Sequence, residues 1–483
     1  MRFFNLAAPC SVTYTTVAAL SASSMTGVAS GTALYTAYPR AACWTLDSAA
    51  TDVPNGLSIV TCATGGVFRR DVVRGCPGAN TVATWYISTA GDNNADGLTS
   101  LTPVRDIEEV LYRIGKQPID GAVVGTVYVY LIAGNFNDGR LYTFDPVYVN
   151  DGALAIVGTK TVVATGTLAT VTPWVEASSV VGSYGLTGAP NLTSLGYVGL
   201  MIRVASGPRA GWKATIAHDL GSGVFQANWC DQSDGSVVEP IVGDSIEVYS
   251  TTKIGGDVRI VGSGSTSSAT GGGTTTFEDV TLGVAGQQHT VTVSGTAQAT
   301  FYACTLRGFD VYEGCSYVNL TACYTLDMRS YGYTDLFGCT HTSAGGTAVS
   351  ARARGIMHVS TRCLINAGSL EAGHHIEGPG TIIAEAPLAV INYGSLDAVR
   401  AYPGSQIVLN AILFVRVSTG QGVGYRVFSG GSIYYTVGLP PVSLPSSGAG
   451  SPLHDLVIGG TTVALSALPS FNSANGACVV VYQ

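Results

Sequence analysis

The stretch Thr84–Val110, TWYISTAGDNNADGLTSLTPVRDIEEV, decides how the chain folds. It opens on an apolar run typical of a strand and continues through a loop bounded by glycines. Beyond this loop the apolar residues recur at helical spacing, with Thr102 placed as N-cap and Pro103 at the first helical position. The pattern predicts a helix over 102–114, ended by Gly115, that covers the open end of a stack of strands.

Strand signals dominate the rest of the chain, as short runs rich in Val, Ile, Thr and Tyr that Gly, Asn, Asp and Ser separate. The runs include Thr13–Leu20, Val127–Ile132, Ala153–Val157, Ser245–Tyr249 and Gln406–Phe414. The sequence therefore predicts an all-β fold class with a single short helix.

The middle of the chain repeats loosely, with a period of about 20 residues. The aligned segments are Phe277–Leu282, Phe301–Leu306, Leu320–Thr325, Leu336–His341 and Ser360–Ile365. Short strands and Gly-rich turns at this period are typical of a β-solenoid, whose coils stack at about 4.8 Å. The last four segments place one cysteine each in the same column, and we expect these thiols to be unpaired and inaccessible to solvent. The cysteine column consists of Cys304, Cys323, Cys339 and Cys363.

The chain has 11 cysteines, none in a CxxC motif and none grouped with histidine at zinc spacing. Most are therefore interpreted as buried free thiols, which pack as small apolar side chains. The disulfide state of four cysteines stays open, namely Cys10, Cys43, Cys62 and Cys76.

Composition excludes several classes of protein. Lys plus Arg is 23 and Asp plus Glu is 31, a net charge of −8, and 46% of the residues are apolar. Such a chain is not disordered, and its acidic balance argues against nucleic-acid binding. It lacks the run of about 18 apolar residues that membrane insertion by a helix requires, and nothing in it implies a cofactor. Polar residues interrupt the N-terminal apolar run, Met1–Cys10, so we expect synthesis without a signal peptide.

Five parts are predicted along the chain. They are small N-terminal β-modules over 1–80, the first strands and capping helix over 81–160, an inserted small β-barrel over 161–252, solenoid coils over 253–438 and a C-terminal β segment over 439–483. The insert is interpreted as a barrel because it has five or six short strands with tight Gly turns and lacks the repeat seen in the middle of the chain.

The strand, Gly/Asp-rich loop and Pro-led helix of Thr84–Val110 resemble the opening of right-handed parallel β-helix proteins of the pectate-lyase-like superfamily. Val104-Arg105-Asp106 stands where this family often has Phe and Thr. Phage tailspikes and tail-associated virion proteins commonly begin this way, and the N-terminal modules and inserted barrel are similar to parts that they carry. The resemblance implies a right-handed parallel β-helix, a homotrimer, docking of residues 1–80 to other tail proteins, and a place in the virion.

The loop Gly91–Gly97 has half of an EF-hand pattern, with oxygen ligands at Asp92, Asn94 and Asp96. The position of the final glutamate ligand is occupied by Pro103. We therefore favour a turn whose side chains bond to nearby backbone amides, and we expect no metal.

A polysaccharide-cleaving β-helix needs carboxylates on its outer face, as an acid and a base or nucleophile in a hydrolase, or as a base in a lyase. The candidate catalytic residues are Asp310, Glu313, Asp327 and Asp335, with Arg329 beside them. The separation of Asp310 and Asp327 is close to one coil of the predicted repeat, so they could lie one above the other. Repulsion would then raise the pKa of one, as an acid catalyst needs. The alternative interpretation is a set of solvated turn residues.

The segment Glu371–Glu377, EAGHHIE, resembles a metal or acid–base cluster. A strand through it would put Glu371, His375 and Glu377 on one face and His374 on the other. The alternative is a polar turn between coils.

Tyrosines crowd successive coils, and exposed rings can stack on sugar faces or form a subunit interface. The candidate glycan-binding residues are Tyr312, Tyr317, Tyr331 and Tyr333. The low fraction of charged residues favours the interface, because partner chains would then cover much of the surface.

Three functions follow as hypotheses. The first is a structural or adhesive virion protein of a phage tail that binds glycan on the host surface, which the scarcity of acidic residues favours. The alternative is a tailspike depolymerase, a glycoside hydrolase or polysaccharide lyase acting on that polysaccharide. A third hypothesis is a secreted pectate-lyase-like protein.

Overall fold

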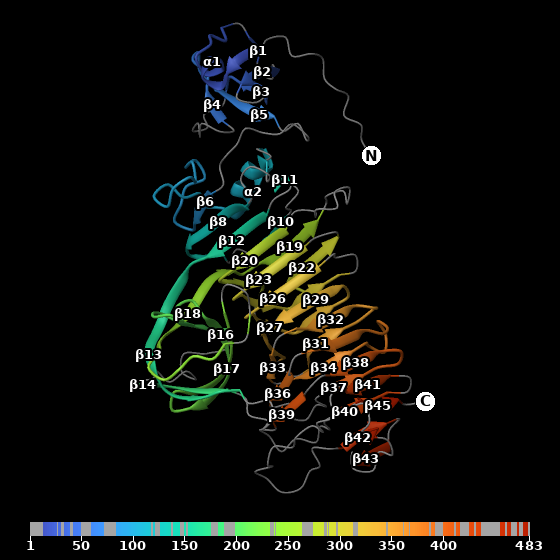
Figure 1. The fold of residues 1–483 in the computed structure, drawn as a ribbon. Helices are drawn as coiled ribbons and strands as arrows, with labels where there is room; N and C mark the ends of the chain where they lie inside the picture. The colour runs from blue at the N-terminus through green and yellow to red at the C-terminus, as the bar shows by residue number, and fades with distance from the viewer. Residues whose placement is uncertain are drawn as a thin grey trace. The chain divides into compact units, whose positions relative to one another are not determined.

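Figure 1 shows the chain as a computed structural model. The chain divides into two compact units. The first contains residues 1–134, 144–157 and 262–275, and the second contains 135–143, 158–261 and 276–483. The structure describes residues 13–26, 28–29, 33–38, 42–49, 59–71, 84–116, 119–120, 126–136, 139–144, 149–150, 153–174, 182–187, 199–231, 236, 238–262, 274–284, 287, 289–295, 298–312, 317–343, 346–360, 362–366, 368–385, 388–391, 399–409, 412–415, 425–428, 431–435, 455–458, 461–464, 471–472 and 477–481.

An N-terminal sheet of five strands belongs to the first unit. In spatial order they are β1 (Thr13–Thr16), β2 (Ala33–Tyr38), β3 (Ala42–Asp47), β5 (Val67–Asp71) and β4 (Ile59–Thr61). The strand expected over Thr13–Leu20 is wrong in its second half, because the helix α1 (Val17–Ser21) follows β1. This helical turn places Leu20 in a buried cluster with Leu46 and Phe68.

The decisive stretch forms a strand, a loop and a helix in the predicted order. The strand is β6 (Thr84–Ser88) and the helix is α2 (Ile107–Lys116). The helix begins later than Thr102 because Val104 is still extended, in a parallel bridge with Ile87. Asp106 stands before the first turn instead, and Gly115 lies inside the last one.

The first unit contains further strands after β6, one of them partly. They are β7 (Ile119–Asp120), β8 (Thr126–Ala133), β11 (Val149–Asn150) and most of β12 (Ala153–Gly158). β6 pairs with β8, and β7 with β11, in parallel. Neither α1 nor α2, the helices of the described ranges, is long and apolar enough to cross a membrane.

The second unit is built mainly from three sheets whose strands pair in parallel through successive coils. Sheet 1 runs β20 (Thr274–Glu278), β23 (Gln298–Tyr302), β26 (Tyr317–Thr321), β29 (Tyr333–Phe337), β32 (Ile356–Val359), β35 (Thr381–Ala384), β38 (Gln406–Leu409) and β41 (Ser432–Tyr435). Sheet 2 runs β18 (Ser245–Ile254), β21 (Val280–Leu282), β24 (Thr305–Arg307), β27 (Tyr324–Leu326), β30 (Thr340–Thr342), β33 (Cys363–Asn366), β36 (Leu388–Ile391) and β39 (Ile412–Val415), and β9 (Asn135–Phe136) also pairs with β18. Sheet 3 runs β10 (Leu141–Phe144), β19 (Asp257–Gly262), β22 (Val291–Gly295), β25 (Phe309–Val311), β28 (Met328–Ser330), β31 (Thr347–Ala351), β34 (Ser369–Ala372), β37 (Val399–Ala401), β40 (Tyr425–Val427) and β42 (Asp455–Ile458). Antiparallel strands end the stack, with β45 (Ala477–Val481) and β44 (Phe471–Asn472) on sheet 1 and β43 (Thr461–Ala464) on sheet 3.

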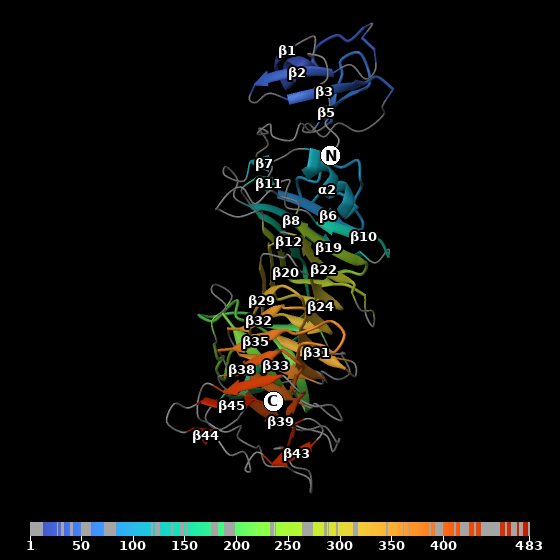
Figure 2. The ribbon, with the colours of Figure 1, turned by 90° about the vertical axis from the view of Figure 1, so that its right-hand side faces the viewer.

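Each coil passes from sheet 1 to sheet 2 to sheet 3, as β23, β24 and β25 do, and Figure 2 shows β29, β32, β35 and β38 of sheet 1 one below another. A single residue with positive φ makes the corner between sheets 1 and 2. On successive coils it is Asp279, Ala303, Ala322 and Gly338. Gly308 and Asp327 turn the chain toward sheet 3 in the same way. The run Gln406–Phe414, expected as one strand, is divided between β38 on sheet 1 and β39 on sheet 2.

The register confirms the predicted repeat, because Thr305, Tyr324, Thr340 and Leu364 pair in sequence along sheet 2. The residue before each belongs to the cysteine column, and all four cysteines are fully buried thiols outside any disulfide, as predicted. Cys62 is also free and buried. Cys10, Cys76 and the side chain of Cys43 lie outside the described residues.

Stacked phenylalanines fill the inside of the first coils. Phe277 and Phe301 stack at 5.4 Å between ring centroids, and Phe309 meets Phe301 edge-on at 5.2 Å. All three side chains are completely buried. Sheet 1 and sheet 3 therefore contact each other through the interior of the coil.

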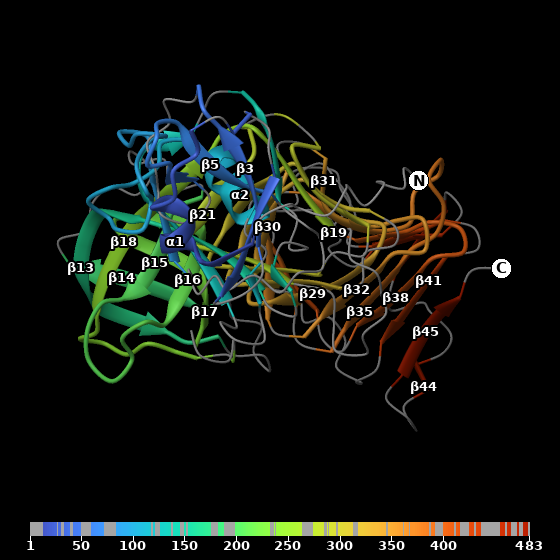
Figure 3. The ribbon, with the colours of Figure 1, turned by 90° about the horizontal axis from the view of Figure 1, so that it is seen from above.

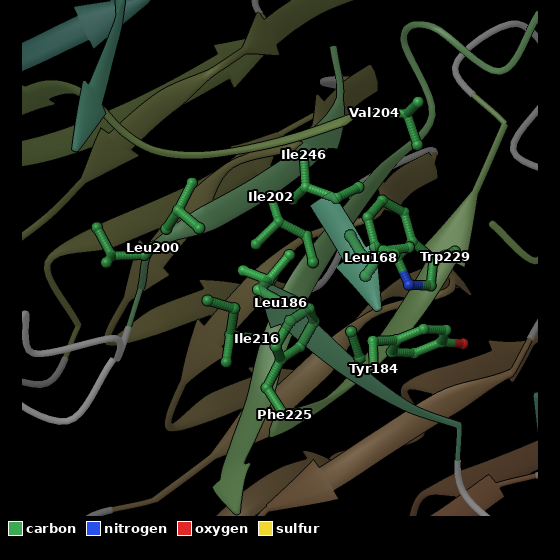
Figure 4. Close-up of a cluster of buried hydrophobic side chains, with 13 residues drawn as sticks. Leu168, Tyr184, Leu186, Leu200, Ile202, Val204, Ile216, Phe225, Trp229 and Ile246 are labelled. Carbon is green, nitrogen blue, oxygen red and sulfur yellow. The ribbon is translucent and has the colours of Figure 1, made fainter. Parts of the chain in front are cut away.

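Six antiparallel strands close a small barrel within the second unit. In spatial order they are β13 (Lys160–Thr172), β14 (Ser183–Thr187), β17 (Val224–Cys230), β16 (Lys213–Gly221), β15 (Met201–Val204) and β18, which pairs again with β13. Tyr184 packs against Phe225 and Trp229 in the barrel interior (Figure 4). The end of β18, Thr252–Ile254, pairs with β21, and the barrel lies beside the coils (Figures 1 and 3). The predicted class, an all-β parallel β-helix with a small inserted barrel, is confirmed.

Candidate functional site

Asp310 is the predicted acid whose position is most unusual. It lies on β25 between Phe309 and Val311, whose side chains face the interior, so its carboxylate points outward from sheet 3. It is nevertheless only 1% exposed. Carboxylates are almost never buried to this degree unless they have a partner.

The partner is His289, one coil earlier. His289 Nδ1 contacts Asp310 Oδ2, and Arg329 Nη1 donates to His289 Nε2 at 2.9 Å. A guanidinium only donates, so Nε2 accepts and Nδ1 carries the proton that points at Asp310. Burial raises the pKa of Asp310, and the contact with His289 opposes that rise. A carboxyl group with a raised pKa is suited to donate a proton.

Two tyrosines form a platform next to Asp310. The rings of Tyr312 and Tyr331 stack at 5.9 Å with an angle of 11° between their planes, and Tyr312 is 41% exposed. Tyr331 donates to Glu377 Oε2 at 3.0 Å. Burial, followed by this bond, raises the pKa of Tyr331 to about 12. Its hydroxyl is therefore protonated at neutral pH and keeps Glu377 at the edge of the platform.

Arginines hold two carboxylates beyond the platform. Arg352 Nη1 donates to Glu377 Oε2 at 2.9 Å, and its Nη2 lies 3.9 Å from Glu371 Oε2. Arg400 Nη1 donates to Glu371 Oε1 at 2.8 Å. Partial burial works to raise the pKa of Glu377, but the bond from Arg352 and its charge outweigh burial and lower it. We call this outer side of sheet 3 the Asp310 face; it comprises His289, Asp310, Tyr312, Arg329, Tyr331, Arg352, Glu371, Glu377 and Arg400.

The segment Glu371–Glu377 does not continue as a strand. β34 ends at Ala372, and His374 and Gly378 close a tight turn through two backbone bonds of 2.9 and 3.0 Å. The side-chain alternation that a strand would give is therefore absent, and the polar-turn interpretation describes the segment. The rings of His374 and His375 lie 4.2 Å apart beside Tyr402.

Asp335 lies on a different sheet. It points outward from β29 of sheet 1, with Asn319 and His358 as its neighbours in register. Tyr317 donates to Asp335 Oδ2 at 2.6 Å and stacks on Tyr333 at 5.7 Å. Burial, followed by the bond to Asp335, raises the pKa of Tyr317 to about 12.

His358 connects Asp335 to two further side chains. Its Nδ1 lies 2.9 Å from both Asp335 Oδ1 and Ser360 Oγ, and its Nε2 lies 3.3 Å from Glu385 Oε1. A serine-hydrolase relay needs the serine and the acid on opposite ring nitrogens. Here Asp335 and Ser360 share Nδ1, and the acid on the opposite ring nitrogen is Glu385, whose side chain is 70% exposed. We call this group, with Tyr317, Asn319 and Tyr333, the Asp335 face.

The predicted catalytic residues therefore divide between two sheets. The hypothesis that Asp310 and Asp327 lie one above the other is wrong, because the register of β25 and β28 pairs Asp310 with Arg329. Asp327 makes a corner at φ 55° and accepts a bond from Ser343 Oγ at 2.6 Å. Glu313 lies outside the described residues.

The side chains of the loop Gly91–Gly97 bond to nearby groups. Asp92 Oδ1 accepts the amide of Asn94 at 2.9 Å, and Asp96 Oδ1 accepts the amide of Leu98 at 3.0 Å. Thr102 donates its hydroxyl to Asp96 at 2.6 Å. Within the described ranges no group of three His, Cys, Asp or Glu side chains could hold a metal ion.

Sequence reasoning missed His289, Arg352, His358 and Glu385. A signal existed for His289, because it precedes Asp310 by close to one coil of the predicted repeat. Arg352 gave none, because the turn that brings Glu377 to it is visible only in the fold.

Comparisons with known proteins concern the whole chain and not the Asp310 face alone. No protein-family model matches the chain, and neither does a curated protein. Among solved structures, a glycoside hydrolase aligns with 78% of this chain and 95% of its own at 8% identity and a TM-score of 0.26. The tailspike protein gp49 of the Acinetobacter baumannii bacteriophage Fri1, a capsular polysaccharide depolymerase, aligns with 86% of this chain and 72% of its own at 10% identity and a TM-score of 0.23. The tailspike gp49 of Pseudomonas phage LKA1 aligns with 62% and 68% at 11% identity and a TM-score of 0.19. TM-scores this low do not establish a shared fold or activity.

Proposed function

We propose that this chain is an adhesive β-helix protein that binds a surface glycan through the Asp310 face. The observation that carries the proposal is the stacked, partly exposed pair Tyr312 and Tyr331 beside a buried acid. Parallel rings offer an apolar surface to the faces of sugars, and the surrounding carboxylates and guanidinium groups offer bonds to their hydroxyls.

The setting of this binding follows from the sequence resemblance. A phage tail is the proposed location, with the glycan on the host surface, residues 1–80 docked to other tail proteins and three copies assembled. Three-fold closure is compatible with this setting and would cover part of a surface that carries few charges.

The test is binding of the purified full chain to an array of bacterial capsular and lipopolysaccharide oligosaccharides. Tyr312→Ala should weaken binding to every oligosaccharide recognised by about tenfold or more, as the loss of a central aromatic contact does. Tyr333→Ala, on the Asp335 face, is the matched control and should leave binding unchanged. Loss of binding in the control alone would contradict the assignment to sheet 3.

A second candidate function is cleavage of the same glycan, favoured by the opposite pKa shifts of two nearby acids. The pKa of Asp310 is raised and that of Glu377 is lowered, and Tyr331, which donates to Glu377, stacks on Tyr312 of the same face. Such a pair can divide the roles of acid and base. New reducing ends that appear with the wild type and disappear with Asp310→Asn would support cleavage. Binding without any release of product would leave the adhesive function alone.

A further inference from the structure

A fully buried lysine in the barrel faces two carboxylates of the coils, apart from both outer faces. Lys213, the first residue of β16, is 0% exposed. Its Nζ lies 2.9 Å from Asp279 Oδ2 and 3.1 Å from Glu278 Oε1. The ring of Tyr302 lies 4.4 Å from the same Nζ. Nothing in glycan binding uses this amine.

Asp279 occupies a position that does not call for a carboxylate. It is a corner residue between sheets 1 and 2 with φ 51°, where later coils have Ala303, Ala322 and Gly338. Its side chain is only 1% exposed, and polar groups converge on it. Tyr249 donates to Oδ1 at 2.9 Å, and Lys160 lies 2.9 Å from Oδ2. A strained corner with a buried, converging carboxylate indicates a chemical role.

We propose that Lys213 and Asp279 form an intramolecular amide bond that joins the barrel to the coils. The lysine nitrogen attacks Asp279 Cγ and forms the new C–N bond, and the C–Oδ2 bond breaks. An ammonium and a carboxylate become an amide and one water: two of the three ammonium protons leave with Oδ2, and one stays on the amide nitrogen. No oxidant or other reactant is required.

The surrounding residues match the steps of this reaction. Glu278 Oε1 accepts a proton from Lys213, because the amine attacks only in its neutral form, and passes that proton to the leaving oxygen. Tyr249 and Lys160 donate to the two Asp279 oxygens where negative charge develops in the tetrahedral intermediate. Burial of Lys213 and Asp279 keeps bulk water away from the product amide.

The experiment is mass spectrometry of the denatured, full-length wild-type protein. The proposal expects a mass one water molecule below that of the sequence, and a proteolytic fragment in which Lys213 and Asp279 are joined. Lys213→Arg and Asp279→Ala should each restore the mass of their own sequence, because each removes one reacting group. Glu278→Gln keeps both reacting groups and should slow the appearance of the joined fragment.

Lys253→Arg is the control, since this lysine lies on β18 and takes no part in the reaction, and it should retain the loss of one water. A wild-type chain of full sequence mass with no joined fragment overturns the proposal. This outcome is measured on the wild type, so it does not depend on whether any variant folds. A lost water that maps to Glu278, to Lys160 or to any other pair also overturns the assignment.

Discussion

Replacing Gly338 by alanine tests how the barrel packs against the coils. Gly338 makes the corner between β29 and β30 at φ 56°, and a Cβ placed there would lie 2.0 Å from the Sγ of Cys230 in β17. Real Cβ atoms do not approach a neighbour closer than about 3.0 Å, so the Cys230 side chain or one of the two strands must move. Ala303 and Ala322 occupy the equivalent corners on earlier coils, so alanine is tolerated there when the neighbouring side chains leave room for its Cβ.

The free-energy cost of Gly338→Ala has two parts. The left-handed backbone costs about 1 kcal/mol for alanine relative to glycine, and overpacking against the sulfur costs about 1–3 kcal/mol more. Gly338→Ala should therefore lower the free energy of unfolding by about 2–4 kcal/mol. Cys230→Ala alone loses one buried sulfur, at about 1 kcal/mol.

The assay is a double-mutant cycle by denaturant unfolding. In the double variant the alanine at 338 no longer meets a sulfur, so the two changes should cost less together than their sum, by about 1–3 kcal/mol. Ala322→Gly is the matched corner control and should be neutral or slightly stabilising, since it relieves the same backbone strain. Strict additivity of Gly338→Ala and Cys230→Ala would refute the contact between the barrel and the coil.

Three further predictions follow from the second unit. The pKa of Tyr317 is about 12 in the folded protein and 10.0 in the unfolded chain, so it contributes stability that is complete below pH 10 and lost as the pH rises through 12. After allowance for solvent screening this contribution amounts to about 1 kcal/mol. In unfolding curves Tyr317→Phe should lose this part of the pH dependence. The cysteine column should resist a thiol reagent in the native protein and react fully in denaturant, whereas rapid native labelling would show that the coil interior opens. Phe301→Ala should cost about 3–5 kcal/mol in denaturant unfolding, because it removes the ring between Phe277 and Phe309; a cost under about 1 kcal/mol would show that the coil interior is not packed as described.

The repeat could be predicted from sequence because each coil sets its own local pattern. A strand, a corner and an inward cysteine recur at similar spacing, so the cysteine column aligns correctly without knowledge of the fold. The start of α2 could not be predicted in this way, since helical spacing is compatible with Thr102 as a cap. The parallel bridge between Ile87 and Val104 keeps the chain extended there, and this contact is invisible in local pattern.

The candidate site was predicted only in part, because coils differ in length. A slightly shorter coil would have put Asp327 over Asp310, but the actual register places Arg329 there. A carboxylate thus has a cation as its neighbour instead of a second acid. Register also decides that Asp335 belongs to sheet 1, on another face of the coil. The positions expected for Asp327 and Asp335 are both wrong because they are counted in residues along the chain, and the corners between strands vary in length.

The most direct test of the central claim is a crystal structure of the full chain with an oligosaccharide that it binds. We expect the sugar rings to lie against Tyr312 and Tyr331 on the outer side of sheet 3, with the carboxyl group of Asp310 within hydrogen-bonding distance of the ligand. An oligosaccharide bound at the Asp335 face, or on the barrel, with the rings of Tyr312 and Tyr331 left uncovered, would contradict the account.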